Sequence, residues 1–308
     1  MFNPERVDNP AYANQLFLKK LETDAGQKHA SEMVSNFIQL KIREDGFARA
    51  MIPPEVVTAE DCQNSEDHDM LTKLVPRAFD NTEAMAVNFL GQHDGRYIKG
   101  DRKRAKFQKI ETLEYSIQEA QILAFAYPVI EWIEKVSIKD LERVEDEKFI
   151  ELSDVATAST GKVINSPATA IDRQVLNTTV KMLNGDSLQM DRFLMHKVDH
   201  DDWSTLPATT VGDKIASEVT VNGWTYTTMQ GYKLVTSIKN LITPGHIYAY
   251  TKPSMLGVFY LLGDTKFQIK KDFDMIHMKG WEYISMLFAN TRAVAKTIIN
   301  VPNPLTGL

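Results

Sequence analysis

Two histidines come nearest to the spacing of a catalytic metal site. His196 and His200 are four residues apart, like a pair of zinc ligands on one face of a helix. A zinc hydrolase of this type also needs a glutamate directly after the first histidine, and Lys197 occupies that position. Asp201 and Asp202 are better suited to cap the start of a helix. A metal-dependent hydrolase that uses His196 and His200 is therefore kept only as a less favoured candidate function.

Other catalytic patterns are absent from the sequence. The run STGK at 159–162 lacks two parts of a P-loop, because Ala156 stands where its first glycine would be and Val163 where its Ser or Thr would be. No nucleophile elbow or dinucleotide-binding glycine pattern occurs. The single cysteine, Cys62, cannot form an intrachain disulfide and lies in a polar segment. We therefore expect a non-enzymatic protein with no catalytic residue, no cofactor and no metal.

Two blocks of opposite charge lie between residues 55 and 109. Residues 55–69 are acidic and residues 99–109 are basic. Tyr97 and Phe107 flank the basic block, which makes a nucleic acid one candidate partner. The net charge of −6 favours protein–protein contact instead, because complementary charges fix the register between partners. We predict intersubunit contacts through charged residues of both blocks: Glu60, Asp61, Glu66, Asp67, Arg102, Lys103, Arg104 and Lys106.

The composition is that of a protein with its own core. Of 308 residues, 43% are hydrophobic and 25% are charged, which is ordinary for a globular chain. This length suggests about two domains. No apolar run long enough to span a bilayer occurs, and the first residues lack the basic and apolar regions of a signal peptide. The sequence thus predicts a soluble protein that folds in a cytoplasm.

The first half of the chain is predicted to combine helices with a long polar excursion. Apolar residues three and four apart predict a helical arm over 9–43, with a break at 24–26. Prolines and a scarcity of apolar residues over 46–108 predict an extended two-stranded arm. Residues 128–152 predict a helix about 37 Å long, with a narrow apolar stripe and a far face dense with charge. Such a helix is a strut across a domain rather than a buried core helix.

The second half is predicted to mix helices and strands. An amphipathic helix is expected over 168–184, where Asn-Gly ends it. Strands and turns dominate 218–275, with two-residue turns at 222–223 and 263–264. The stretch 281–299 is again rich in β-prone residues. The fold class is therefore α+β.

The order of these parts resembles the major capsid proteins of tailed bacteriophages, whose fold is named after phage Hong Kong 97. Residues 137–146 (SIKDLERVED) are similar to the family's spine helix. Residues 244–248 and 253–257 are similar to late strands of its axial domain. Residues 290–294 (NTRAV) are similar to the family's closing Asn-Pro-Arg-Ala-Val, with Thr291 in place of the proline. The resemblance covers nearly the whole chain.

The resemblance implies a Hong Kong 97-type capsid fold in five parts. They are an N-terminal arm (1–45), an extended loop that lies over a neighbour (46–112), a peripheral domain with a spine helix (113–157), an axial domain (158–280) and the closing strand of the peripheral domain (281–308).

The function implied is self-assembly. Copies of the chain would form hexamers and pentamers of an icosahedral shell around double-stranded DNA, in the virion and, during assembly, in the host cytoplasm. The implied partners are portal and scaffolding proteins, a decoration protein and the packaged DNA that lies nearby. No contact with a membrane is expected. Because the chain begins close to the arm, the scaffolding protein is expected to be separate. An encapsulin-like nanocompartment shell has the same fold and is the nearer alternative.

Overall fold

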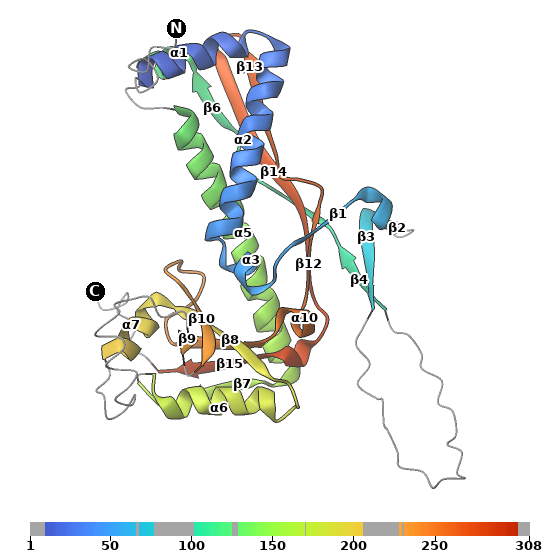
Figure 1. The fold of residues 1–308 in the computed structure, drawn as a ribbon, viewed down its shortest axis with the longest axis vertical. Helices are drawn as coiled ribbons and strands as arrows, with labels where there is room; N and C mark the ends of the chain where they lie inside the picture. Colours follow the sequence, from blue (N-terminus) through green and yellow to red (C-terminus); the bar gives the residue numbers. More distant parts are fainter. Residues whose placement is uncertain are drawn as a thin grey trace.

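The chain forms two bodies that share one long helix, and a hairpin projects to one side (Figure 1). The computed structural model describes residues 10–65, 68–76, 102–124, 129–169, 171–205, 228–229 and 231–300. One body is built on an elongated sheet and the other on a more compact sheet (Figure 1).

The N-terminal arm consists of three helices: α1 (Pro10–Leu21), α2 (Asp24–Asp45) and α3 (Phe47–Met51). The break predicted at 24–26 lies two residues earlier, at 22–23, and residues 24–26 form the first turn of α2. Leu21 and Val34 are buried, and α2 packs against α5 and β13 of the body described below. The few apolar residues of the arm therefore pack against the body of the same chain.

The long helix α5 (Val129–Thr160) confirms the predicted strut and continues eight residues beyond it. It contains no Gly or Pro, and it ends before Gly161, whose φ of 68° suits a residue without a Cβ. Leu141 and Phe149 are each 1% exposed. The helix is thus buried along part of its length, because the arm covers one side and a sheet the other.

The long sheet is organised around β14 (Met275–Phe288). One edge of β14 pairs with two successive strands and the other edge with two more, so the sheet is narrow and elongated. A sixth strand runs parallel to β12. The partners of β14 and this sixth strand are β12 (Gly257–Leu262), β13 (Lys266–Asp272), β5 (Gln108–Glu111), β6 (Tyr115–Gln118) and β1 (Glu55–Val57). Alternate residues of β14 are buried, and α5 packs against this strand while α2 packs against β13, as a one-sided sheet requires.

The compact sheet has the order β7-β15-β11-β8-β10-β9. Its strands are β7 (Val163–Ser166), β8 (Met190–His196), β9 (Thr228–Met229), β10 (Tyr232–Ser237), β11 (His246–Thr251) and β15 (Val294–Ile299). The helices of this body are α6 (Arg173–Asn184), α7 (Lys197–Thr205) and α10 (Pro253–Leu256). Helix α6 ends where Asn184-Gly185 predicts, and its apolar face covers the sheet.

The projecting hairpin is built from β2 (Gln63–Ser65), β3 (His68–Pro76) and β4 (Arg102–Lys106). The short helices η2 (Ala59–Asp61) and α4 (Glu119–Ala124) lie before and after it in the chain. A small apolar cluster that includes Val75, Phe107 and Tyr260 packs the base of the hairpin against the long sheet. The excursion predicted over 46–108 is present, but as a three-stranded antiparallel sheet, and β1 within that range belongs to the long sheet.

The two sheets do not match the predicted ranges 158–280 and 281–308. β12 and β13 fall within 158–280 yet lie in the long sheet, and β15 falls within 281–308 yet lies in the compact sheet. The reason is that, after α5 has led into the compact sheet, the chain crosses between the sheets twice more, through α10 into β12 and through η3 (Thr291–Ala293) into β15.

The predicted start of a helix at Asp201 is wrong. Helix α7 begins at Lys197, directly after β8, so Asp201 lies inside it. His196 supplies the local acceptor instead, because its Nδ1 accepts the backbone N–H of Val198 at 3.2 Å. The turn predicted at 222–223 lies outside the described residues.

Candidate functional site at the root of the projecting hairpin

The two candidate zinc ligands do not share one helix. His196 is the last residue of β8, whereas His200 lies in α7. His196 is buried, and His200 lies 3.6 Å from the Asp201 carboxylate. Among the described residues, no group of three or more His, Cys, Asp or Glu side chains could hold a metal ion.

The described part of the acidic block lies at the surface. Glu60 and Asp61, on η2, are both exposed. The Asp61 carboxylate accepts hydrogen bonds from the backbone N–H and the hydroxyl of Thr58, at 3.1 and 3.0 Å. These bonds lower the pKa of Asp61, so its charge is secured at neutral pH. Glu66 and Asp67 lie outside the described residues.

The basic block divides between two roles. Arg104 and Lys106 are exposed on β4. The Lys103 ammonium group instead donates to two carbonyl oxygens at the end of β14, at 3.3 and 3.4 Å. The Arg102 side chain lies outside the described part of the chain. Lys103 therefore anchors the hairpin to its own body, while Arg104 and Lys106 face outward.

The described residues of the two charge blocks form no ion pair with each other. In the part of the chain that the structure describes, no ion pair joins η2 to β4. The charges of Glu60 and Asp61 on one side and of Arg104 and Lys106 on the other thus face outward. Contact between subunits through these residues stays a prediction.

Arg49 on α3 binds two carboxylates at a buried point between α3, α5 and the long sheet. Its guanidinium donates to both oxygens of Glu145 on α5, at 2.7 and 2.6 Å, and to Glu282 on β14 at 3.1 Å. Thr265, in the turn between β12 and β13, donates to the same Glu282 oxygen at 3.0 Å. The three charged side chains are at most 2% exposed. One cation is therefore shared by two carboxylates away from water.

A second group of charges follows on α5. The Asp146 carboxylate accepts the backbone N–H of Ala48 at 2.9 Å and the Lys239 ammonium group at 2.6 Å. Lys239 also pairs with Glu142 at 3.3 Å. Because Lys239 follows β10, this group connects the compact sheet to both α5 and α3.

A third contact fixes the other end of α3. Arg192 on β8 donates to the carbonyl oxygens of Ala50 and Met51, at 2.7 and 3.3 Å. A five-residue helix has no stability of its own, so these charged contacts and the apolar packing of its buried residues decide where α3 lies. We refer to six of the charged residues as the junction cluster: Arg49, Glu142, Glu145, Asp146, Lys239 and Glu282.

The junction cluster has four carboxyl groups and two cations. Burial raises the pKa of Glu145 well above its ordinary value, the charge of Glu282 adds to this rise, and Arg49 opposes it. Burial also raises the pKa of Asp146, against the opposing effects of Lys239 and the Ala48 N–H. Glu145 therefore retains a proton at a pH where an exposed glutamate has lost its own.

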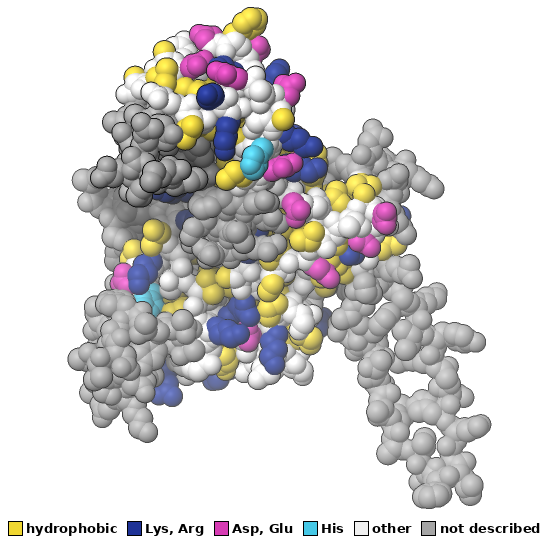
Figure 2. Space-filling view, turned by 45° about the horizontal axis from the view of Figure 1, so that its top comes forward, with side chains coloured by type: hydrophobic (Ala, Val, Ile, Leu, Met, Phe, Trp, Pro, Cys, Tyr) yellow, Lys and Arg dark blue, Asp and Glu magenta, His cyan; other side chains and the backbone are white. Residues whose placement is uncertain are grey.

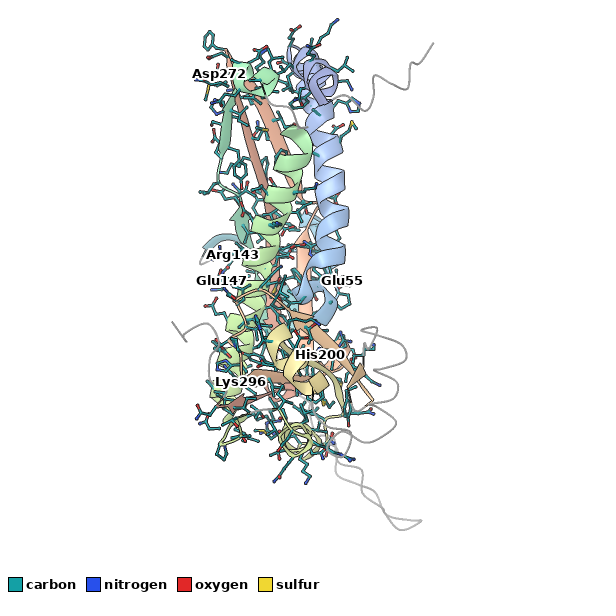
Figure 3. The ribbon with its side chains drawn as sticks, turned by 90° about the vertical axis from the view of Figure 1, so that its left-hand side faces the viewer. Glu55, Arg143, Glu147, His200, Asp272 and Lys296 are labelled. Atoms are coloured by element: carbon teal, nitrogen blue, oxygen red, sulfur yellow. The ribbon has the colours of Figure 1, made fainter. Side chains whose placement is uncertain are left out.

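An open groove of about 1000 Å³ adjoins the junction cluster. It is lined by one face of α5 and by the residues that follow β10, including Glu142 and Lys239 of the cluster. Arg143 lies on the same helix, one turn before Glu147 (Figure 3). The Lys239 side chain is 30% exposed, so this half of the cluster borders solvent while Arg49 does not.

The surface carries charges of both signs. Figure 2 shows acidic, basic and hydrophobic side chains interspersed over the upper part of the visible face. Phe273 is 92% exposed at the turn between β13 and β14, beside Asp272 at one end of the molecule (Figure 3). No helix in the described ranges is long and apolar enough to cross a membrane.

Sequence patterns missed the junction cluster. The charged residues of α5 were predicted on a solvent-facing side of a strut, yet Glu145 and Asp146 are fully buried. One signal was available, because Glu145 is four residues from both Leu141 and Phe149 and so falls on their buried face. Its partners Arg49 and Glu282 lie too far away in the sequence for any spacing rule.

Comparison with known proteins finds similarity in structure alone. No protein-family model matches the sequence, and no curated protein matches it either. A chain from Microbacterium phage Oxtober96 matches with a TM-score of 0.61 and 11% identity, over 82% of this chain and 91% of that one. A chain from the capsid structure of cyanophage P-SCSP1u matches with a TM-score of 0.57 and 11% identity, over 80% and 86%. A chain of the virus-like particle from Pyrococcus furiosus matches with a TM-score of 0.50 and 11% identity, over 86% and 98%.

Proposed function

We propose that this chain, which has the Hong Kong 97-type capsid fold expected from its sequence, is the major capsid protein of a tailed bacteriophage. It assembles as hexamers and pentamers into an icosahedral shell around double-stranded DNA and resides in the virion. A portal, a scaffolding protein and a decoration protein are its expected partners. The body with α5 and the long sheet is the peripheral domain, and the body with the compact sheet is the axial domain.

The observation that supports this proposal most is the extent of the fold match. The similarity runs over most of this chain and most of the phage chains, so it includes both bodies rather than one common motif. The projecting hairpin adds to it. Its packed base is small, and Arg104 and Lys106 face outward, as expected for a segment that lies on another copy.

One observation favours a second candidate of the same class. The match to the Pyrococcus furiosus virus-like particle extends over nearly all of that chain. An encapsulin-like shell that holds a protein cargo would use the same fold. The contents of the particle separate the two candidates, since a phage shell encloses double-stranded DNA and a nanocompartment encloses protein.

Electron microscopy of negatively stained protein tests the proposal directly. The chain would be expressed alone and together with its neighbouring genes. We expect closed shells, or rings of five and six copies. A monodisperse monomer under every condition, co-expression included, would overturn the assembly function and return attention to His196 and His200.

A further inference from the structure

The junction cluster contains more acid than its two cations balance. Glu145 and Glu282 accept hydrogen bonds from the same Arg49 nitrogen, Nη2, at 2.6 and 3.1 Å. Oxygen atoms bound to one nitrogen are at most about 6 Å apart, and two ionised carboxylates this close in a buried site repel each other strongly. Within the described residues, Nη1 of Arg49 and Oε1 of Glu282 have no hydrogen-bond partner. The geometry therefore provides one positive charge for two carboxyl groups.

The neighbouring elements supply no second cation for this pair among the described residues. Helix α3 contributes Arg49, the turn after β12 contributes the uncharged Thr265, and β14 contributes Glu282 itself. Helix α5 contributes three acids, and the residues after β10 contribute Lys239, which is bound to two of them. Arg192 contacts only the C-terminal end of α3, where it donates to the backbone carbonyl groups of Ala50 and Met51.

We propose that Glu145 keeps its proton beside the Glu282 carboxylate, and that this proton acts as a clamp that holds α5 against the long sheet at the position of α3. With the proton in place, Arg49 balances the one remaining negative charge. When the proton leaves, two carboxylates on different elements repel each other at a buried point. The least costly response is for β14 and α5 to separate there and admit water, which also loosens α3.

The clamp has a definite direction with pH. The pKa of Glu145 is raised in the folded chain, so its contribution to stability is complete below the ordinary pKa of a glutamate and is lost as pH rises through the raised value. The pKa of Asp146 is raised as well and acts in the same direction. The clamp is therefore tight in acid and loosens toward alkaline pH.

Hydrogen–deuterium exchange of the full chain measures the clamp locally. Exchange would be followed from about pH 5 to about pH 9 and corrected for the intrinsic pH dependence of amide exchange. In the wild-type chain, we expect protection of α3 and of the peptides around Glu145 and Glu282 to fall at least about tenfold over this range, as for a shift of one pKa unit. Peptides of α6 should stay unchanged and serve as the internal reference.

Three variants decide the outcome. Glu145→Gln and Glu282→Gln each replace one of the two neighbouring carboxyl groups by a neutral amide, so either should keep α3 protected at every pH. Glu151→Gln is the matched control, because Glu151 is an exposed acid on the same helix that pairs with Lys148. It should keep the wild-type pH dependence. If Glu145→Gln fails to fold, Glu282→Gln alone tests the clamp.

An infrared spectrum gives a second readout. At neutral pH, the wild type and Glu151→Gln should show the carbonyl band of a protonated carboxyl group, and Glu145→Gln should lack it. A wild-type chain whose α3 protection is flat with pH, or a Glu145→Gln chain that keeps the full pH response, would overturn the proposal. Neither measurement needs a shell, so a failure of the assembly function would leave this result intact.

Discussion

Arg49 is the side chain on which the position of α3 depends most. Arg49→Met keeps its length but leaves Glu145 and Glu282 buried without a cation. We expect a loss of about 3–5 kcal/mol in the free energy of unfolding at neutral pH, measured by urea titration.

A matched substitution separates charge from bulk. Arg173 is exposed at the start of α6, and Arg173→Met should change the free energy of unfolding by less than about 0.5 kcal/mol. A loss below about 1 kcal/mol for Arg49→Met would mean that packing, and not charge, holds α3 in place.

The candidate site could be predicted only in part from single residues. The outward positions of Glu60, Asp61, Arg104 and Lys106 follow from their polar surroundings in the sequence. The junction cluster does not, because a buried charge is recognisable only through partners that the fold brings near. Lys103 shows the same limit, since its acceptors lie at the end of β14.

In the turn between β13 and β14, the residue type is poorly suited to the backbone conformation. Phe273 has a φ of 52°, a conformation that costs a residue with a Cβ about 1–2 kcal/mol, and its ring is almost fully exposed. Phe273→Gly should therefore raise the free energy of unfolding by about 0.5–1 kcal/mol, after the greater freedom of glycine in the unfolded chain is subtracted. Thermal unfolding followed by circular dichroism would measure it.

Phe273→Ala is the control for this turn. It removes the ring but keeps the Cβ, so no gain in stability is expected. A gain equal to that of Phe273→Gly would show that the exposed ring, rather than the backbone, is the source of the cost.

Helices and strands with a regular apolar pattern were predictable because the pattern lies within the sequence of each element. The amphipathic stripe predicted the start of α5 and the end of α6, and β10 to β13 lie within the predicted strand region 218–275. Helix α7 was misplaced because its start is set by β8 and the His196 side chain instead of a capping aspartate. The assignment of strands to sheets was beyond local rules, since the chain crosses between the bodies.

At the scale of the whole molecule, the exposed charges of the hairpin are expected to act between copies. Arg104→Glu combined with Lys106→Glu should leave the chain folded, with an unchanged circular dichroism spectrum, and prevent closed shells in electron micrographs. Lys103 is left intact, because its loss would also detach the hairpin from β14. Normal particles would show that these charges are not used between subunits.

Two further variants make this test more specific. Arg173→Glu with Lys181→Glu reverses two exposed charges on α6 and should not affect shells if the effect is specific to the hairpin. Adding Glu55→Lys and Glu60→Lys to the hairpin variant restores opposite signs. Recovery of shells in that chain would identify the acidic block as the partner of the basic one.

The overall fold was predictable because the order of parts along the chain is informative even where identity is low. The helical arm, hairpin, long helix and mixed body follow one another as expected. The ranges of the bodies were not predictable from that order, because β12 to β14 complete the long sheet before β15 returns to the compact one.

The place of β15 in the compact sheet also bears on synthesis. It lies between β7 and β11, and β7 has no other partner among the described strands. The long sheet has all its strands once Phe288 has emerged from the ribosome, whereas the compact sheet has to wait for residues 294–299. A nascent chain that stalls or is cut before this point leaves β7 and one edge of β11 unpaired, and such unpaired strand edges favour aggregation over correct folding.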